Sequence, residues 1–178
     1  KNEQLDFIYS DEDKIEDDGS HRHEPYFKPD WSPDTLFSYM YTCHFSVYRK
    51  SLLDEVGELR KECDGAQDYD LALRFTEKTT PERIGHVAKI LYHWRKRIGS
   101  TAENPEAKEY VKKATERCLE DAFHRRGIEA HLENVPDAYQ TRVVYETVGN
   151  PLVSVVIPSK DHPELLELCL RTLREKTQ

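Results

Sequence analysis

The sequence predicts an α/β protein with a mixed sheet flanked by helices, and two observations carry this prediction. Apolar runs with the residue types of buried strands occur at Phe7–Tyr9 and, late in the chain, at Leu152–Ile157. Helical patterns lie between and after these runs, and the clearest of them opens at Asn104 and Pro105 and ends at Gly127. Strands that alternate with helices are typical of α/β domains.

Length and composition limit how many domains the chain can form and which kinds of partner we expect. The chain has 178 residues, which is enough for one domain with a sizeable core but too short for two full α/β domains. With 34% charged residues and a net charge of −8, it lacks the concentrated basic face of a nucleic-acid groove, so we expect no nucleic-acid partner. There is neither a long apolar segment nor a signal peptide, and the four scattered cysteines favour free thiols in a reducing cytosol.

The first apolar run ends in three consecutive carboxylates, Asp11-Glu12-Asp13. We expect the strand to stop there, at the sheet edge where open α/β sheets bind ligands. Asp11 and Asp13 could then share Mg²⁺ or Mn²⁺ with the oxygens of a diphosphate. The alternative is a solvated acidic loop, because Asp and Glu are common after strands.

Two irregular segments follow the acids. Residues 16–25 read as a polar loop, in which His21 and His23 are exposed residues rather than metal ligands. Residues 26–34 contain three aromatic side chains, among them Trp31. An aromatic loop beside carboxylates suits the stacking of a sugar, although packing onto the core is the commoner use of such side chains.

The next elements are predicted from local signals. Ser32 and Pro33 open a helix to about Met40, and Gly57 ends a short helix that starts at Ser51. The remaining elements up to the basic loop are a strand over Tyr41–Tyr48, a helix from about Asp68 to Lys78, and short strands over Arg83–Val87 and Lys89–Trp94.

Two polar sites in this region invite a chemical interpretation. Asp68 lies at or near a helix start, where it could cap the helix or act as a rigidly aimed general base. The basic loop from Arg95 to Thr101 carries glycine and hydroxyl groups, so it could close over phosphates or simply be solvated.

The C-terminal part reads as a connector followed by a new unit. Residues 128–150 form the connector, with one strand over Arg142–Val148. Leu152–Ile157 and a helix over Glu164–Lys176 then start a βα unit that has no partner left in the chain. We therefore expect the chain to be an excerpt of a longer protein.

Several motifs, taken together, resemble family 2 glycosyltransferases, the inverting group with the GT-A fold, most closely in its bacterial members. They are, in this order, Tyr-Ser-Asp-Glu-Asp-Lys, Lys-Pro-Asp-Trp-Ser-Pro-Asp, Gly-Ala-Gln-Asp-Tyr-Asp-Leu, Tyr-His-Trp-Arg and Gly-Ser-Thr-Ala, and the match is close over residues 5–101. Residues 150–162 resemble the opening strand and turn of another domain of the same family. Each motif alone is weak, and the order of all of them is what makes the resemblance specific.

The resemblance implies a domain organisation. Residues 1–127 would be the catalytic, acceptor-binding half of a partial GT-A domain, residues 128–150 a connector, and residues 151–178 the orphan βα start of a second transferase domain. The nucleotide-binding first half is missing, so we expect the chain alone to be inactive. Leu152–Ile157 would either pair with the main sheet or project as an arm, and we favour pairing.

The resemblance also implies roles for individual residues. Asp11 would approach the ribose or a metal-bound water, Asp13 would ligate the cation, and Asp68 would be the catalytic base. Gln67 stands where the family usually has Glu, which leaves the base in place but bears on how the acceptor is positioned. His93 would be either a further metal ligand or a packed strand residue. The remaining expected contacts are Arg95, Lys96, Ser100 and Thr101 for the donor, and Trp31, Gln67 and Tyr69 for the acceptor.

The function implied is transfer of a sugar, with inversion, from a nucleotide-diphosphate donor to a glycan acceptor in cell-surface polysaccharide assembly. Residues 92–95 lack the Gln-x-x-Arg-Trp motif of processive members, which favours single-sugar transfer. The protein would be cytoplasmic and touch a membrane only through a parent protein or a lipid-linked acceptor. The alternatives are a non-catalytic glycan-binding half domain and a metal-dependent phosphohydrolase, which would need more acids or histidines near Asp13.

Overall fold

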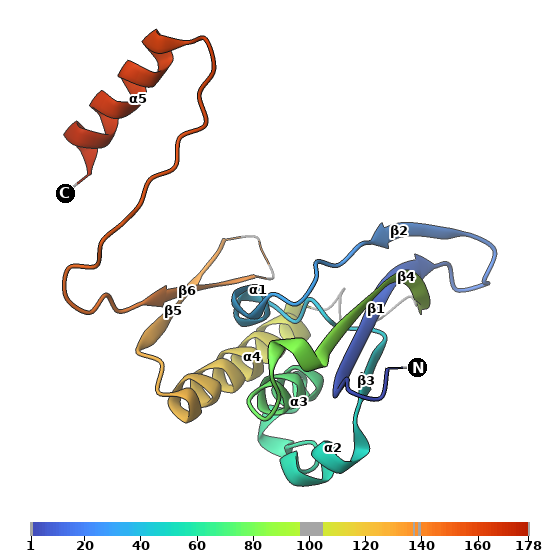
Figure 1. The fold of residues 1–178 in the computed structure, drawn as a ribbon. Coiled ribbons are helices and arrows are strands. Elements are labelled where there is room, and N and C mark those ends of the chain that lie inside the picture. Colours follow the sequence, from blue (N-terminus) through green and yellow to red (C-terminus); the bar gives the residue numbers. More distant parts are fainter. Residues whose placement is uncertain (1, 97–104, 137, 139, 178) are drawn as a thin grey trace. The chain divides into compact units, whose positions relative to one another are not determined.

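The computed structural model describes residues 2–96, 105–136, 138 and 140–177. It confirms the predicted class, because a mixed sheet is flanked by helices (Figure 1). The chain divides into two compact units, residues 1–146 and residues 147–178. Among the described residues, no helix combines the length and the apolar character needed to cross a membrane.

Strand β1 (Phe7–Ile15) is the centre of the main sheet. Strand β4 (Ile84–Arg95) pairs with it in parallel along its whole length. Two strands share the other edge: β3 (Ser46–Tyr48) is antiparallel to the first part of β1, and β2 (Arg22–Tyr26) is antiparallel to its last part. The central strand is therefore covered on both edges.

Strand β1 continues past the three acids to Ile15 instead of stopping at them, which corrects our prediction. Asp11, Glu12 and Asp13 lie inside the strand and are buried. Local sequence could not show this, because β2 and β4 come from later in the chain and complete the hydrogen-bonded ladder around the acids. Buried charges persist only where partners compensate them, so each acid needs a polar neighbour.

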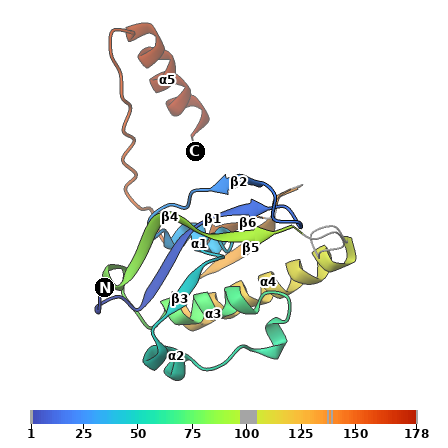
Figure 2. The same ribbon diagram turned by 90° about the vertical axis from the view of Figure 1, so that its right-hand side faces the viewer.

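Helices pack against the sheet and against one another (Figures 1 and 2). Phe7 of β1 lies close to Phe75, with ring centroids 6.2 Å apart, and Phe37 meets Phe123 edge to face at 5.4 Å. Of the apolar stripe predicted for the helix after Asn104, Ala114, Cys118 and Ala122 are buried as expected, and Val111 is half-buried. The helices are α1 (Pro33–Ser38), α2 (Lys50–Val56), α3 (Gln67–Thr76) and α4 (Pro105–Arg126), with short 3₁₀ turns at Lys61–Cys63 and Pro81–Arg83.

Local capping signals placed several helix ends correctly. Ser32 precedes α1 and Pro33 is its first residue. Gly57 ends α2 with a φ of 91°, and Gly127 follows α4 with a φ of 63°. Glycine adopts such positive-φ conformations without the steric penalty of a Cβ atom, so the sequence alone predicts where these two helices end.

Three strand predictions in the first unit need correction. The two short strands expected at residues 83–94 form one continuous strand, β4, whose register with β1 shifts between Ser10 and Glu12. Only Ser46–Tyr48 of the expected strand at residues 41–48 pairs with β1. The polar loop expected at residues 16–25 folds back as β2, and its Pro25 is tolerated there because proline is compatible with an edge strand.

Residues 128–146 are more ordered than a connector with one strand. Strands β5 (Ala130–Asn134) and β6 (Thr141–Tyr145) form an antiparallel hairpin. Strand β6 contacts α1, and Leu132 and Val143 pack against the main core. The hairpin therefore belongs to the first compact unit, which extends to Glu146.

The second unit contains helix α5 (Pro163–Lys176), as predicted. Leu152–Ile157, the segment with the strongest strand pattern, forms no strand in this single chain, where we had favoured its pairing with the main sheet. A strand is stabilised by the ladder it shares with a partner, and strand propensity alone does not supply one.

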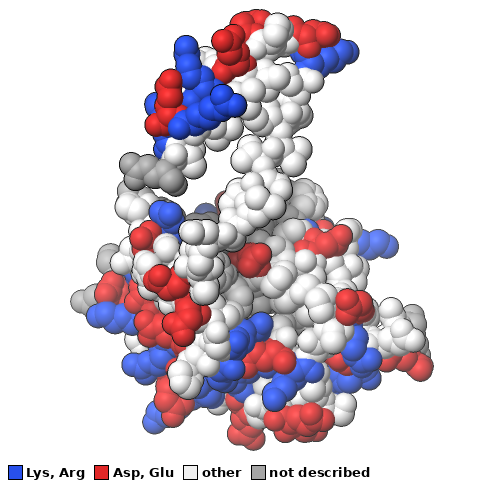
Figure 3. All heavy atoms as spheres, turned by 60° about the vertical axis from the view of Figure 1, so that its left-hand side comes forward, with Lys and Arg blue, Asp and Glu red and all other residues white. Residues whose placement is uncertain are grey.

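On the face drawn in Figure 3, charged side chains are not sorted by sign. Figure 3 shows basic and acidic residues interspersed on one face of the protein. Some form ion pairs, such as Arg125 with Glu77 at 2.7 Å and Lys113 with Glu109 at 3.2 Å.

Candidate functional site

Each of the three consecutive acids of β1 lies beside a histidine from a distant part of the chain. His86 Nε2 lies 2.7 Å from Asp11, and His93 Nδ1 lies 2.5 Å from Asp13. Glu12 accepts a hydrogen bond from the backbone N–H of His44 at 3.0 Å, and the ring of His44 lies 3.6 Å away. The acidic strand is thus a row of carboxylate–imidazole pairs.

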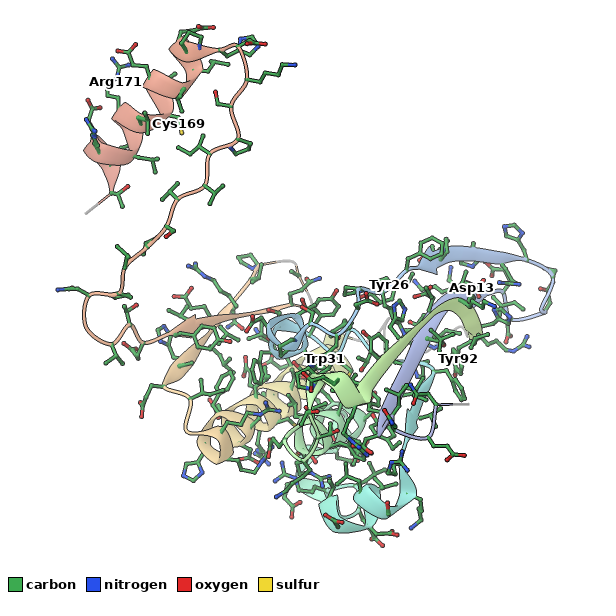
Figure 4. The ribbon with its side chains drawn as sticks, in the orientation of Figure 1. Asp13, Tyr26, Trp31, Tyr92, Cys169 and Arg171 are labelled. Carbon is green, nitrogen blue, oxygen red and sulfur yellow. The ribbon has the colours of Figure 1, made fainter. Side chains whose placement is uncertain are left out.

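Asp13 has the most accessible histidine partner. Its own side chain is 4% exposed, whereas that of His93 is 39% exposed. Arg22 of β2 donates to its second oxygen at 2.7 Å. Figure 4 shows Asp13 on β1 beside β4, the strand that carries Tyr92. Burial raises the pKa of Asp13, but hydrogen bonds from His93 and Arg22 outweigh it, so the pKa lies below its ordinary value.

Asp11 anchors the aromatic loop that follows β2. It accepts a hydrogen bond from the backbone N–H of Lys28 at 3.0 Å, and Tyr9 donates to the carbonyl of Pro29 at 2.7 Å. Trp31 follows and packs against Tyr41, with ring centroids 6.5 Å apart. The loop is therefore fixed onto β1 at its start, and Trp31 is half-buried rather than free.

Glu12 belongs to a different environment from Asp13. The buried ammonium of Lys28 lies 3.3 Å from Glu12 and also donates to the carbonyl of Thr42 at 2.7 Å. In the sheet, Glu12 pairs with Tyr92 and Asp13 pairs with His93. Because successive residues of a strand point to opposite faces, Glu12 and Asp13 lie on opposite faces of the β1–β4 ladder.

Asp68 lies on the surface at the start of α3. It is the second residue of the helix and is exposed, and its Oδ1 accepts a hydrogen bond from the backbone N–H of Tyr69 at 2.9 Å. The cap position itself is held by Ala66, so Asp68 is not the capping residue. Burial raises the pKa of the Tyr48 phenol, and the negative charge of nearby Asp68 raises it further.

The neighbours of Asp68 differ in their availability. Gln67 is half-buried and donates to the side chain of Asp64. Tyr69 is buried, and its hydroxyl donates to the carbonyl of Leu36. Tyr69, which we expected at the acceptor site, therefore lies in the core, where it holds α3 against α1.

The expected donor contacts at the end of β4 are only partly described. Arg95 donates to the carbonyl of Asp17 at 2.6 Å, and the backbone N–H of Lys96 donates to Ile15 at 2.9 Å. Both side chains are exposed at the same end of the sheet as Asp13. Ser100 and Thr101 lie outside the described residues.

Sequence reasoning missed several members of this site, namely Arg22, Lys28, His44 and His86. Arg22 was assigned to a solvated loop, although the short polar turn before it is a hairpin signal that could have placed it opposite the end of β1. The other three have no local signal, because they reach the acids through contacts between distant segments.

Two groups of three potential metal ligands occur among the described residues. They are Glu12 with Cys43 and His44, and the buried group Cys63, Asp70 and Cys118. Neither includes Asp13, so the Asp13–His93 pair offers a cation two protein ligands rather than three.

Fold and site together define an α/β protein with a buried acidic strand faced by histidines. No family model matches the chain. It is 41% identical over 175 residues to the O-antigen biosynthesis protein RfbC of Myxococcus xanthus, an alignment that covers 98% of this chain and 13% of that protein. It is 39% identical over 173 residues to the uncharacterized protein y4gI of Sinorhizobium fredii (strain NBRC 101917 / NGR234), covering 96% and 19%. The chain thus spans less than a fifth of either relative.

Proposed function

We propose that this chain is the catalytic half of a domain that transfers a sugar, with inversion, from a nucleotide-diphosphate donor to a glycan acceptor in polysaccharide assembly. The observation that carries the proposal is the contact between Asp13 and His93, 2.5 Å apart on adjacent strands. The name of the relative from Myxococcus xanthus supports a role in polysaccharide assembly. We call a protein that joins this chain to a nucleotide-binding half the intact transferase.

The residues present fit a divalent cation. Asp13 and His93 supply one carboxylate and one imidazole near the C-terminal ends of β1 and β4. Mg²⁺ and Mn²⁺ are six-coordinate, so two protein ligands leave room for waters and phosphate oxygens. The imidazole favours Mn²⁺ over Mg²⁺, which prefers oxygen ligands. Among the described residues no group of three ligands includes Asp13, which favours a substrate-completed site over that of a hydrolase.

In this proposal, the chain's own residues place the donor at the C-terminal end of β1. Asp13 and His93 would hold the cation, which when bound offsets negative charge on the departing nucleoside diphosphate. Arg22, half exposed and 2.7 Å from Asp13, would contact the same phosphates. Arg95 and Lys96 would add positive charge from β4, and Ser100 and Thr101 remain expected donor contacts.

Asp68 would be the base. It would accept the proton of the acceptor hydroxyl while that oxygen forms a bond to the anomeric carbon and the bond to the diphosphate oxygen breaks. A single displacement of this kind inverts the anomeric centre. Exposure of Asp68 in the first turn of α3 leaves it accessible to an acceptor, and Gln67 and Trp31 would help to position that acceptor.

Metal-dependent donor binding tests the proposal. In the intact transferase, Asp13→Ala is expected to abolish the Mn²⁺-dependent part of nucleotide-diphosphate sugar binding, measured by calorimetry with and without Mn²⁺. Asp17→Ala, which removes an exposed acid from the neighbouring turn, is the matched control and should leave binding unchanged. Unchanged donor affinity in Asp13→Ala would show that Asp13 does not bind the metal ion, and it would contradict the proposed donor site.

A further inference from the structure

A second cluster of potential ligands lies on the other face of the β1–β4 ladder from Asp13. It consists of Glu12, Cys43 and His44, whose ligand atoms all lie within 4.8 Å of one another. The Sγ of Cys43 is 3.0 Å from Nδ1 of His44, and that nitrogen is 3.6 Å from a carboxylate oxygen of Glu12. A thiol, an imidazole and a carboxylate thus converge from β1 and from the loop before β3.

We propose that Glu12, Cys43 and His44 form a zinc site. Thiolate, imidazole and carboxylate are the three ligand types that Zn²⁺ takes in proteins, and the soft thiolate selects zinc over the harder ions Mg²⁺ and Mn²⁺. Tetrahedral zinc with ligand bonds of about 2.0–2.3 Å places neighbouring ligand atoms about 3.3–3.6 Å apart. The observed separations of 3.0 and 3.6 Å need only small adjustments to reach that geometry.

The loop that carries two of the ligands is held in place from several sides. Lys28 donates to the carbonyls of Thr42 and His44, and Ser46 donates to the carbonyl of Cys43 at 3.0 Å. The backbone N–H of His44 donates to Glu12 at 3.0 Å. Because these bonds fix the backbone between residues 42 and 44, the ligands are arranged before any ion arrives.

The histidine ring is also fixed. It stacks on Tyr92 of β4, with centroids 4.7 Å apart and planes at 12°, and lies 5.3 Å from Trp94. Tyr92 and Trp94 flank His93 in β4, so the zinc site and the Asp13–His93 pair use alternate residues of the same two strands. Packing of this kind orients a ligand as hydrogen bonds around known metal sites do.

Local charge favours a divalent cation despite the presence of Lys28. Its ammonium lies 3.3 Å from Glu12, but the Glu12 carboxylate and the thiolate that Cys43 would form on binding zinc would together outnumber this single positive charge. Glu12 also has a second oxygen to offer. Three protein ligands leave the fourth position of a tetrahedral site for water or another ligand.

Cobalt substitution tests the site on the 178-residue chain. Co²⁺ occupies zinc sites, and a bound thiolate gives it a charge-transfer absorption band in the near ultraviolet. We expect this band on titration with Co²⁺, its loss on addition of Zn²⁺, and its absence in Cys43→Ser. Zn²⁺, but not Mg²⁺, should also protect Cys43 from alkylation by iodoacetamide, located by mass spectrometry.

Matched variants separate this site from the other cysteines and from the proposed donor site. Cys118→Ser alters the buried Cys63–Asp70–Cys118 group and Cys169→Ser alters α5, and both should keep the band. Asp13→Ala should keep it as well, so the zinc site and the transferase proposal can fail independently. Absence of the band in the folded chain, its persistence in Cys43→Ser, or its loss in Cys118→Ser would each overturn the proposal.

Discussion

Buried carboxylates in two regions of this protein have different kinds of partner. Asp6, before β1, is held by Arg49 and Arg83, and Asp70 of α3 is held by Arg60 and Arg74. The acids in the second half of β1 instead lie beside His86, His44 and His93. The first set pairs with arginines, whereas each acid of the second set has an imidazole neighbour, with Arg22 also at Asp13 and Lys28 also at Glu12.

This difference separates the acids that are committed to the fold from the acids that could bind a metal ion. A guanidinium is always charged and has no lone pair to offer, so a carboxylate that it binds on both oxygens is committed to the fold. A neutral imidazole is itself a metal ligand and can share an ion with the carboxylate beside it. The partner of each acid therefore indicates where a cation can enter.

The largest change in stability is expected when an acid of the arginine-bound set is replaced. Asp70 is fully buried between Arg60 and Arg74, so Asp70→Asn removes the buried charge that both guanidiniums share and leaves Arg60 with its half-exposed partner Asp121. We expect a loss of about 3–5 kcal/mol in the free energy of unfolding, measured by urea denaturation. Asp68→Asn, two residues earlier and exposed, should change it by less than about 0.5 kcal/mol. Equal losses in the two variants would contradict the distinction.

Asp68→Asn, which should hardly change stability, should have a large effect on catalysis. In the intact transferase, Asp68→Asn keeps a nearly isosteric side chain but cannot accept the proton of the acceptor. We expect turnover to fall by about 10²-fold or more, with donor affinity nearly unchanged. If Asp68→Asn loses folding rather than rate, Asp68 has a structural role and is not the base.

The pH dependence of stability gives a further test of the ion pairs at Asp70. Burial raises the pKa of Asp70, but Arg60 and Arg74 lower it more, so its pKa in the folded protein lies below its ordinary value. The unfolded chain therefore binds more protons at low pH, and the stability from Asp70 is lost as the pH falls below about 4. Urea denaturation at pH 6 and at pH 3.5 should show a larger loss for the wild type than for Asp70→Asn. A larger loss in the variant would contradict this sign.

The smallest expected effect concerns the aromatic loop. Trp31 is half-buried and packs against Tyr41, so an acceptor sugar could stack only on the part of the ring that stays exposed. In the intact transferase, Trp31→Ala is expected to raise the KM for the acceptor by about 5-fold, because stacking on an aromatic ring contributes about 1 kcal/mol. Trp31→Phe should restore most of this loss. A KM that does not change in Trp31→Ala would exclude Trp31 from the acceptor site.

Local signals predicted the helices, and long-range contacts decided the rest. Gly57 and Gly127 mark helix ends because a single residue type fits that backbone conformation. Nothing near Asp13 in the sequence shows that β1 continues through it, because its partners Arg22 and His93 come from β2 and β4. Leu152–Ile157 shows the reverse case, in which strand propensity without a partner gave no strand.

The candidate site was predictable in its residue types but not in its geometry. The family resemblance offered Asp13 as a ligand of the cation and His93 as either a further ligand or a packed strand residue, and in the structure the two side chains are in contact. The exposure of Asp68 agrees with its expected position near a helix start, whereas Tyr69, its neighbour, is buried in the core. A helix turns by about 100° per residue, so adjacent residues face different surroundings, and the motif alone does not show which one faces solvent.

Binding of Mn²⁺ to the 178-residue chain tests the central claim most directly. The number of bound ions and their affinity can be measured by titration of the free Mn²⁺ signal in electron paramagnetic resonance. The account predicts one site whose affinity falls by at least about 10-fold in Asp13→Ala and in His93→Gln, while Asp17→Ala and Cys43→Ser bind as the wild type does. Equal Mn²⁺ affinity in Asp13→Ala and the wild type would contradict it.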